Sequence, residues 1–376
     1  KYNNAYSTSS FTPPAHASLF TSRYVGNHGL ITWNRLPEDQ LTLAEVMSGH
    51  GYVSAARVNL QMLSQQGLYQ GFKYQREHTS VEEYVVDGRL IVDDALDLLN
   101  MDMAGPFIMW LHFYDVHSPY GRQTEWTKRF VETTRPGIGD TIKHYRLTPT
   151  ETSYGHNLEE SGLTEADLDY IAARYDGGVA YVDFTLKRLF QALNTPQHLS
   201  DTMVVVTSDH GENLLERESC RFAHDPFLQS TVTRVPLLIR YPGLPGAGQS
   251  SDALVSLIDV APTVLDVAGL PAPPTFTGTS LVPLLAGESH WSRQELYMEC
   301  WGNYERKAVR SDRHLIIHDV KTNMTQLYDL AADPREMHPL TDTQDPDMVE
   351  LYKKLVRFNQ REVSKVAAEG FDPETT

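Results

Sequence analysis

Apolar runs and helix-like periodicity alternate along most of the chain. Apolar residues at helical spacing predict three helices, over 42–49, 81–100 and 164–194. Short apolar and β-branched runs predict four strands, near Tyr52, Phe107, Met203 and Pro236. Because buried strands that alternate with helices form parallel sheets with both faces covered, we expect an α/β fold with a mainly parallel sheet sandwiched by helices.

The pattern changes towards the C-terminal end. Four short strand-like runs are separated by turns, ELYMEC, KAVRS, RHLIIHDV and QLYDL, and a helical pattern then covers 348–367. This order predicts a small antiparallel sheet with a covering helix. We therefore divide the chain into a large domain, 1–290, and a small α+β unit, 291–376. Three larger side chains of this unit are expected to pack in the interior rather than to line a pocket: Trp301, Tyr304 and His314.

One long segment, 122–162, has no clear periodicity. It is rich in Thr, Gly and His. Loops of this length are usually functional or mobile, so we expect an excursion over the ligand-binding edge of the sheet. Two interpretations stay open here, a loop that shapes a substrate pocket and a plain surface insertion.

Composition and charge narrow the range of partners. The chain has 376 residues, 41% of them hydrophobic, and a formal net charge of −17. This negative charge argues against nucleic acid or an anionic membrane as the main partner. No apolar run is long enough to span a bilayer. Cys220 and Cys300 cannot form a disulfide framework, although a single bridge between them stays open.

The segment FTPPAHASLFTSRYVGNHGL, residues 11–30, places a hydroxyl beside a helix that opens with proline. Thr12 precedes Pro13 and Pro14, which the first turn of a helix tolerates. The free N–H groups and dipole of that turn attract an anion such as a sulfate or phosphate ester, which the Thr12 oxygen could attack. From this segment alone, an ordinary N-cap is the favoured role of Thr12.

A second segment adds a candidate metal site. The run DTMVVVTS, residues 201–208, predicts a buried strand, and Asp209, His210 and Gly211 follow where it ends. Ligands collect at such strand ends, and a carboxylate beside an imidazole suits a divalent cation. By itself an Asp-His-Gly sequence is weak evidence, because such pairs occur in many surface turns.

A third segment, like the second, has histidines near the end of a predicted strand. The run PFIMWLHF, residues 106–113, is followed by a loop that contains Asp115 and His117. His112 lies inside the run, so a hydrogen-bonded core histidine is the favoured interpretation for it. His117 lies in a proline-containing loop and is expected to be exposed to a ligand.

In their order along the chain, several segments resemble the sulfatase family of the alkaline phosphatase superfamily. These are FTPPAHASLFTSRY, NHGL, GYVSAARVN, WLHFYDVHSPY, RYDGGVAYVD, VVVTSDHGEN, AHDPFLQSTVTRVPLLIRYPG, SLIDVAPTVLDVAGLP and LYDLAADPRE. The resemblance implies an alkaline phosphatase-like fold and metal-dependent hydrolysis of sulfate or phosphate esters. The metal would be a divalent ion, Mn²⁺, Ca²⁺, Mg²⁺ or Zn²⁺. The expected partner is then an ester of a small molecule, a glycan or a lipid head group.

The resemblance also implies a role for Thr12. It occupies the nucleophile position of the family, where sulfatases carry a Cys or Ser that is oxidised to formylglycine. Thr12 is expected to remain an unmodified hydroxyl, similar to the threonine nucleophile of related phosphodiesterases and of lipoteichoic acid synthases. This departure favours hydrolysis or transfer of phosphodiesters or phosphonate esters over sulfate esters.

Other roles are implied position by position. Asp209 and His210 match the late metal ligands of the family and would bind the cation together with Thr12. His117 and His224 match residues that contact ester oxygens or the leaving group. His16 takes the position of the motif arginine. Asn59, which stands where many sulfatases have a lysine, and His112 are the candidate substrate-binding residues.

The N-terminal part of this chain lacks the acidic residues that the resemblance leads us to expect, so the expected metal shell is incomplete. Family members begin with a strand that carries acidic metal ligands, whereas this chain has no carboxylate before Glu38. We therefore expect the chain to be part of a longer protein that includes this strand, and export stays open. The alternative is a catalytically inactive relative that binds an anionic glycan or lipid head group. The sequence indicates no oligomeric state.

Overall fold

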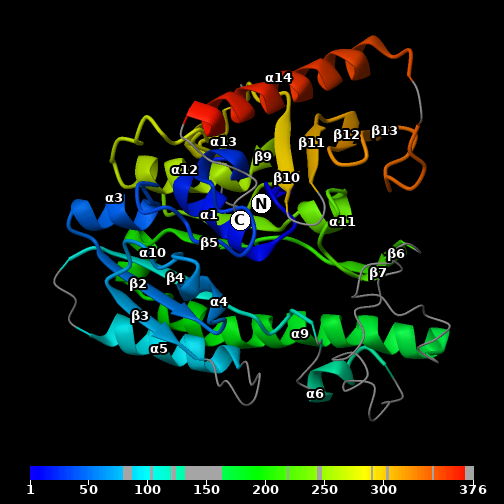
Figure 1. Ribbon diagram of the computed structural model, residues 1–376. Helices are drawn as coiled ribbons and strands as arrows, with labels where there is room; N and C mark the ends of the chain where they lie inside the picture. Colours follow the sequence, from blue (N-terminus) through cyan, green and yellow to red (C-terminus); the bar gives the residue numbers. More distant parts are fainter. Residues whose placement is uncertain are drawn as a thin grey trace.

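The computed structural model shows two central sheets with helices on both sides and a third sheet at the C-terminal end (Figure 1). It describes residues 1–78, 87–101, 105–118, 120, 124–131, 163–217, 220–243, 248–288, 291–301, 305–340 and 343–368. The loop predicted over 122–162 therefore lies mostly outside the described residues, and so does Tyr304.

The first central sheet has the strand order β5-β8-β1-β9. Its strands are β1 (Tyr2–Tyr6), β5 (Val204–Thr207), β8 (Leu237–Arg240) and β9 (Ser251–Ser256). β1 pairs in parallel with β9, whereas β8 runs antiparallel to both of its neighbours. The chain leaves β1 and enters the loop that ends at Thr12. This strand was not predicted from the sequence.

The second central sheet is wholly parallel and has the order β3-β2-β4. Its strands are β2 (Val53–Val58), β3 (Tyr74–Glu77) and β4 (Phe107–His112). The four predicted strands therefore exist as β2, β4, β5 and β8. The mainly parallel α/β architecture is confirmed, with β8 as an antiparallel member of the first sheet.

A large cavity separates the two central sheets. Its volume is about 1360 Å³, and its lining includes every residue of β4 and β5. Among the described residues, β4 pairs only with β2 and β5 only with β8, so the other edge of each strand is free of a strand partner. The apolar side chains of both strands are only half-buried, although runs of this composition are normally buried on both faces.

Helices cover both faces of this arrangement (Figure 1). On one face lie α1 (Thr12–Thr21), α3 (Leu43–Gly49) and α12 (Val260–Val267), which contact one another. On the other face lie α5 (Gly88–Asn100) and α9 (Glu165–Ala192). α3 and α9 confirm two predicted helices, and each begins with a capping box, formed by Thr42 with Glu45 and by Thr164 with Asp167.

The helix predicted over 81–100 is described only from Gly88 onwards, since 79–86 lie outside the described residues. The other helices described before the C-terminal sheet are short. They are α2 (Val25–His28), α4 (Met62–Gln65), α6 (Thr124–Thr127), α10 (Pro196–Asp201), α11 (Ser230–Thr233), α13 (Val282–Leu285) and the 3-10 helix η1 (Leu257–Asp259). In the described part of the chain, no helix combines the length and apolarity needed to cross a membrane.

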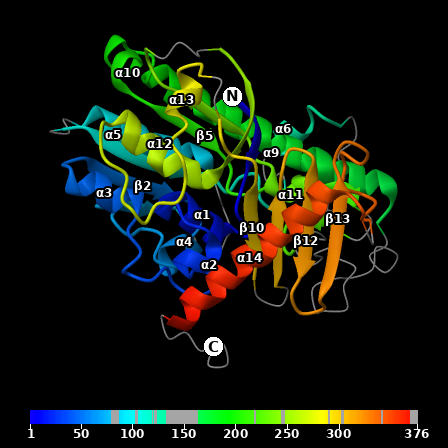
Figure 2. The same cartoon turned by 90° about the horizontal axis from the view of Figure 1, so that it is seen from above.

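The C-terminal sheet is antiparallel, in the order β10-β11-β12-β13. Its strands are β10 (Leu296–Cys300), β11 (Arg306–Arg310), β12 (His314–Asp319) and β13 (Met324–Asp329). Figure 2 shows α14 (Pro346–Ala368) lying across this sheet. Val309 and Ile316 of the sheet pack against Met348, Leu351 and Leu355 of α14. The predicted small sheet with its covering helix is confirmed.

The division into domains 1–290 and 291–376 stays a prediction. Side chains from both parts share one core cluster, in which Tyr6 and Leu254 pack with residues of β10, β11 and β12. A hairpin formed by β6 (Asn213–Arg217) and β7 (Cys220–Ala223) follows the end of β5. Cys300 is buried and donates from Sγ to Asp225 Oδ1 over 2.9 Å, and it forms no disulfide among the described residues.

Candidate active site

Thr12 is the first residue of α1 and lies at one end of the large cavity. The N-cap of α1 is Phe11, which makes no side-chain capping bond. Thr12 Oγ1 instead lies 3.0 Å from His210 Nε2, within hydrogen-bond distance. The interpretation of Thr12 as an ordinary N-cap is therefore wrong, because the helix begins one residue earlier than that role requires and the hydroxyl faces another strand end.

His210 has a defined tautomer. Its Nδ1 lies 2.8 Å from the carbonyl oxygen of Gly211, and a carbonyl only accepts, so Nδ1 carries the proton. The Nε2 lone pair is then directed towards Thr12. Burial is the main cause that lowers the pKa of His210, while neighbouring Asp209 opposes it. A neutral imidazole with one N–H on a backbone carbonyl is the form that metal-ligating histidines adopt.

Gly211 lets this strand end approach α11 closely. A Cβ on Gly211 would lie 2.5 Å from the carbonyl oxygen of Thr231, which no side chain tolerates. The Gly211 N–H donates to the Val232 carbonyl over 2.8 Å. Glycine is thus required at the turn that fixes His210.

Asp209 lies between two histidines. Its Oδ2 is 3.5 Å from His210 Nε2 and 3.6 Å from His16 Nδ1. Burial alone would raise the pKa of Asp209, but His210, His16 and His112 outweigh it and hold the pKa well below its usual range. His16 Nδ1 also donates to the carbonyl oxygen of Thr12 over 2.9 Å. A carboxylate that stays ionised is therefore held beside the Thr12 hydroxyl.

His112 is the last residue of β4 and points its ring at His16, with ring centroids 5.1 Å apart. Its Nδ1 is buried and has no hydrogen-bond partner among the described residues. Burial lowers the pKa of His112 to about 3, and the charge of nearby His16 adds to this effect. The expectation of a hydrogen-bonded core histidine is therefore wrong for this nitrogen, since the ring lines the cavity beside Asp209 instead.

His117 lies in the loop after β4, as predicted, and lines the cavity. Its Nδ1 donates to the Ser118 carbonyl over 2.8 Å, and its ring stacks on Tyr114 at 4.3 Å. Burial lowers the pKa of His117 to about 4, and His224, at a ring distance of 5.3 Å, adds to this lowering. His117 is thus held neutral and oriented from two sides.

Glu212 joins the site, although the sequence analysis assigned it no role. Its Oε1 lies 3.0 Å from His224 Nδ1, and both side chains are largely buried. Burial would lower the pKa of His224, but Glu212 reverses the direction and the pKa is raised. The His224 ring packs on His210 at 4.2 Å. The signal in the sequence was the carboxylate that ends the run TSDHGE.

Asn59, predicted to bind substrate, lies beneath the site and does not line the cavity. It is 1% exposed, and both ends of its amide are engaged. Its Nδ2 donates to Asp115 Oδ2 over 3.3 Å, and its Oδ1 accepts from the Tyr114 N–H over 2.8 Å. Asp115 Oδ1 in turn accepts from the Gly88 N–H over 2.9 Å. Asn59 therefore fixes the loop that carries His117.

The donor set suits a divalent cation. Asp209 supplies a carboxylate, His210 a neutral Nε2 and Thr12 a hydroxyl oxygen, and the last two lie 3.0 Å apart. A mixed set of oxygen and imidazole nitrogen ligands suits ions of intermediate hardness, and three protein ligands leave open positions for substrate. The unpartnered Nδ1 of His112 is a further donor nearby. In its residue types, the site fits the metal that the resemblance implies.

Comparison with known proteins gives matches over most of the chain. The profile of the sulfatase family matches residues 1–270, and that of the C-terminal region of N-sulphoglucosamine sulphohydrolase matches residues 220–363. The chain is 26% identical to arylsulfatase K of Gallus gallus, over 94% of this chain and 74% of the relative. It is 25% identical to a delta 4,5-hexuronate-2-O-sulfatase of Bacteroides thetaiotaomicron, over 89% of this chain and 76% of the relative.

Solved structures share the fold. One, determined with its substrate D-glucosamine-2-N,6-O-disulfate, superposes with a TM-score of 0.78 at 22% identity, over 96% of this chain and 90% of that one. The phosphonate monoester hydrolase of Agrobacterium radiobacter also gives a TM-score of 0.78, at 20% identity, over 96% and 88%. Sulfatase relatives of this kind hydrolyse sulfate esters, and family members generally use a divalent metal. With its family profile covering most of the chain and its alkaline phosphatase-like fold, this protein belongs to the sulfatase family of the alkaline phosphatase superfamily.

Proposed function

We propose that this protein is a metal-dependent hydrolase of sulfate- or phosphate-type esters in which Thr12 is the nucleophile. The observation that carries the proposal is the contact of 3.0 Å between Thr12 Oγ1 and His210 Nε2. It brings a hydroxyl at the positive end of α1 to the end of β5, where Asp209 is held ionised. Both residues open onto the same cavity.

A divalent cation bound by Asp209, His210 and Thr12 would lower the pKa of the Thr12 hydroxyl and offset charge on the ester oxygens. The Thr12 proton then passes to solvent in the cavity. Thr12 Oγ1 attacks the sulfur or phosphorus atom, and the bond from that atom to the leaving-group oxygen breaks on the opposite side. Pro13 and Pro14 carry no N–H and the Ala15 N–H donates to the Phe11 carbonyl, so α1 would stabilise the anion in this step mainly through the positive end of its dipole.

The histidines around Thr12 have two further roles in this proposal, contact with the ester oxygens and protonation of the leaving group. His16 and His117 line the cavity with Thr12 and would contact the non-bridging ester oxygens through Nε2. The Nδ1 proton of each ring is engaged by a backbone carbonyl, so donation from Nε2 requires the imidazolium form. His224 uses Nδ1 for Glu212, which leaves Nε2 to donate a proton to the departing oxygen. A raised pKa suits His224 for this role, because the group has to carry a proton at neutral pH.

Phosphorus is the preferred central atom in this proposal. Formylglycine forms from Cys or Ser, whereas this chain has Thr12 at the position that we match to the family nucleophile. A covalent threonine ester has to be cleaved by water or by an acceptor alcohol, so phosphodiesters and phosphonate esters, by hydrolysis or transfer, are the expected substrates. The shared fold with a phosphonate monoester hydrolase supports this reading, whereas the relatives that act on sulfated sugars support an anionic sugar ester.

We further propose that a carboxylate from outside the described residues completes the metal shell. The cavity between β4 and β5 leads to Asp209 and His112, and both strands have a free edge along it. An extended segment paired with these edges would end beside Asp209 and could deliver acidic ligands there. A longer form of the protein that includes such a segment is therefore expected to bind the cation more tightly than residues 1–376 do.

The test compares an aryl phosphodiester with the matching aryl sulfate, with Mn²⁺ or Ca²⁺ added, for this chain and for a longer form. Thr12→Val keeps the shape without the hydroxyl, and Thr12→Ser keeps the hydroxyl, with mass spectrometry to verify an unmodified side chain. Turnover of the phosphodiester that is lost only in Thr12→Val supports the proposal. Turnover of the sulfate alone would reverse the preference for phosphorus. Absence of both turnover and metal binding would favour the alternative, an inactive binder of an anionic glycan or lipid head group.

A further inference from the structure

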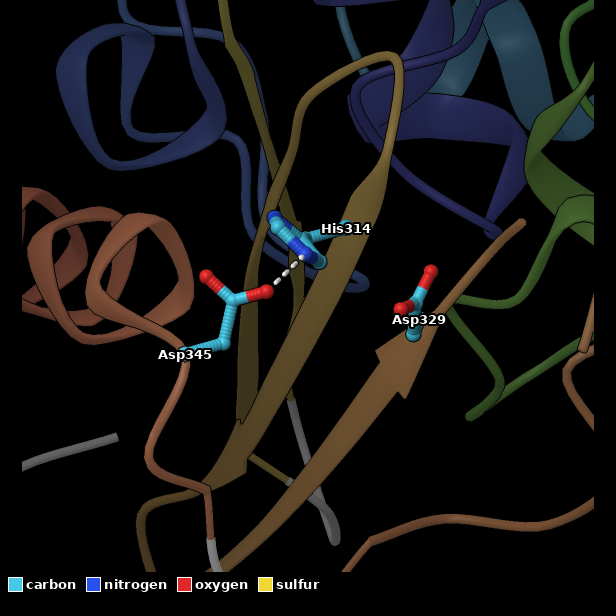
Figure 3. A group of neighbouring side chains, drawn as sticks. All are labelled: His314, Asp329 and Asp345. Atoms are coloured by element: carbon cyan, nitrogen blue, oxygen red, sulfur yellow. Dashed lines mark ion pairs between the residues drawn. The ribbon is translucent and has the colours of Figure 1, made fainter. Parts of the chain in front are cut away.

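Three potential metal ligands meet at the edge of the C-terminal sheet, apart from the candidate active site. His314 is the first residue of β12, and Asp329, opposite it in the strand register, is the last residue of β13. Asp345 directly precedes α14. One ligand atom from each lies within 4.8 Å of the others. Figure 3 shows the Asp345 carboxylate pointing at the His314 ring, with Asp329 on the neighbouring strand.

Backbone contacts orient both carboxylates. Asp345 Oδ1 accepts from the N–H groups of Asp347 and Met348, at 2.9 and 3.4 Å, and so caps α14. Asp329 Oδ1 accepts from the N–H of Ala331 at 3.0 Å. In each residue Oδ2 makes none of these backbone contacts, so it is available to bind an ion between the strands and the helix. Metal ligands whose other oxygen is hydrogen-bonded to the backbone are already oriented for an ion before it binds.

The environment of the His314 imidazole indicates a bound ion. His314 is 2% exposed, and its Nε2 makes no hydrogen bond with the described residues. This atom nevertheless lies 3.3 Å from Asp345 Oδ2. Two ligands of one tetrahedral ion, each bonded at about 2.0–2.2 Å, are separated by about 3.4 Å. The two atoms are therefore spaced as neighbouring ligands of one ion, and they are not aligned as donor and acceptor.

Arg313 holds the position of a cation in this structure. Its guanidinium lies 3.2 Å from Asp329 Oδ2 and 3.4 Å from Asp345 Oδ2. The Arg313 side chain is 54% exposed, whereas the His314 side chain is 3% exposed. Exposed arginine–carboxylate pairs contribute little to stability, so this side chain can swing into solvent at small cost.

We propose that His314, Asp329 and Asp345 form a binding site for a divalent transition-metal ion, Zn²⁺ by its ligand types, which replaces the Arg313 guanidinium. One imidazole and two carboxylates match the ligands that zinc accepts, and water would take the fourth position. The ion would join β12, β13 and the start of α14. Its role would be structural, because it would hold α14 on the sheet that packs beneath it.

The test is a Zn²⁺ titration by calorimetry, with thermal unfolding at each zinc concentration. All variants carry Asp209→Asn, so that zinc binding at the candidate active site does not add to the measured number of zinc ions per chain. We expect one zinc per chain and a rise in Tm. His314→Gln and Asp329→Asn should weaken binding at least tenfold. Arg313→Gln should strengthen it several-fold, because a competing cation is removed. Asp312→Asn, an exposed neighbour outside the cluster, is the matched control.

Arg313→Gln keeps the proposal testable even if the other variants fold poorly, since it leaves all three ligands in place. Cobalt provides a second measurement, because bound Co²⁺ with a tetrahedral nitrogen and oxygen shell gives visible absorption that should vanish in His314→Gln. Zinc affinity that is the same in the Arg313 and His314 variants as in the control overturns the proposal. Binding of zinc without a change in Tm would overturn the structural role.

Discussion

Glu212 and His224 form a buried pair in the candidate active site, with Oε1 and Nδ1 3.0 Å apart. The two residues come from opposite strands of the β6–β7 hairpin region, one just before β6 and the other just after β7. Glu212 fixes the orientation of the His224 ring and favours its protonated form. In the proposed mechanism the pair supplies the proton donor for the leaving group.

Glu212→Gln should reduce turnover most for esters with poor leaving groups. A general acid contributes about 10²–10⁴-fold when the leaving group needs a proton and little when it does not. We expect kcat for an alkyl ester to fall by about 100-fold, and kcat for a 4-nitrophenyl ester to fall far less. The measurement is a series of leaving groups of graded pKa. Glu216→Gln, an exposed carboxylate on the same hairpin, is the control, and an equal loss across the series would exclude a role in proton donation.

Arg293→Met should destabilise the whole protein. Asp259 is fully buried, and Arg293 donates to both of its carboxylate oxygens, at 2.7 and 2.6 Å. Removal of one partner from a buried ion pair leaves an uncompensated charge and costs about 3–5 kcal/mol. Urea denaturation should show this loss in the free energy of unfolding.

The double variant Asp259→Leu with Arg293→Met is the control for that measurement. Without either charge, part of the stability should return. Because Asp259 lies within 1–290 and Arg293 within 291–376, a single cooperative transition in all three proteins would also show that the two predicted domains unfold together. Separate transitions would support independent units.

The elements with a clear apolar or helical pattern could be predicted from the sequence. α3, α9 and the four strands of the C-terminal sheet are examples. β1 was missed because its sequence, YNNAY, has two asparagines in five residues, a composition unfavourable for strands. Pairing with β8 and β9 overrides that preference. Tertiary contacts of this kind have no local signal.

Apart from Glu212, the candidate site residues were identified through motifs, but their contacts were not. Thr12 and His210 are 198 positions apart, so their contact depends on how the strands assemble. The same limit applies to Asn59. It lies at the motif position of a substrate ligand, but its amide group is hydrogen-bonded to Asp115 and Tyr114. A residue type at a motif position predicts which chemistry is available, whereas burial and partners decide whether a ligand can reach it.

Gly71→Ala should destabilise the protein, whereas Gly49→Ala should not. Gly71 has a φ of +86°, and a Cβ there would lie 2.4 Å from the backbone nitrogen of Glu45. Left-handed backbone costs about 1–2 kcal/mol for other residues, and overpacking adds about 1–3 kcal/mol. Gly49 lies at the end of α3 with nothing within 4 Å of a Cβ, so alanine there should be neutral or stabilise by up to about 1 kcal/mol. Equal urea midpoints for the two variants would contradict this account.

His28 should make the protein sensitive to acid. The residue is fully buried, its Nδ1 accepts from the Leu30 N–H over 3.1 Å, and its Nε2 lies 3.1 Å from Ser18 Oγ. These contacts fit a neutral ring. Burial lowers the pKa of His28 to about 3, and the charge of Arg23 adds to this lowering.

The folded pKa of His28 therefore lies below that of the unfolded chain, about 6.5. Between these two values the unfolded state binds more protons, so stability should fall as the pH falls, by about 1.4 kcal/mol per pH unit below 6.5. His28→Asn keeps an acceptor for the Leu30 N–H but cannot titrate. The difference in unfolding free energy between the two proteins, measured in urea from pH 7.5 to pH 4.5, should be constant above pH 7 and shrink below pH 6. A difference that stays constant over the whole range would mean that His28 is not the group that resists protonation, because all other titrating groups are common to both proteins and cancel.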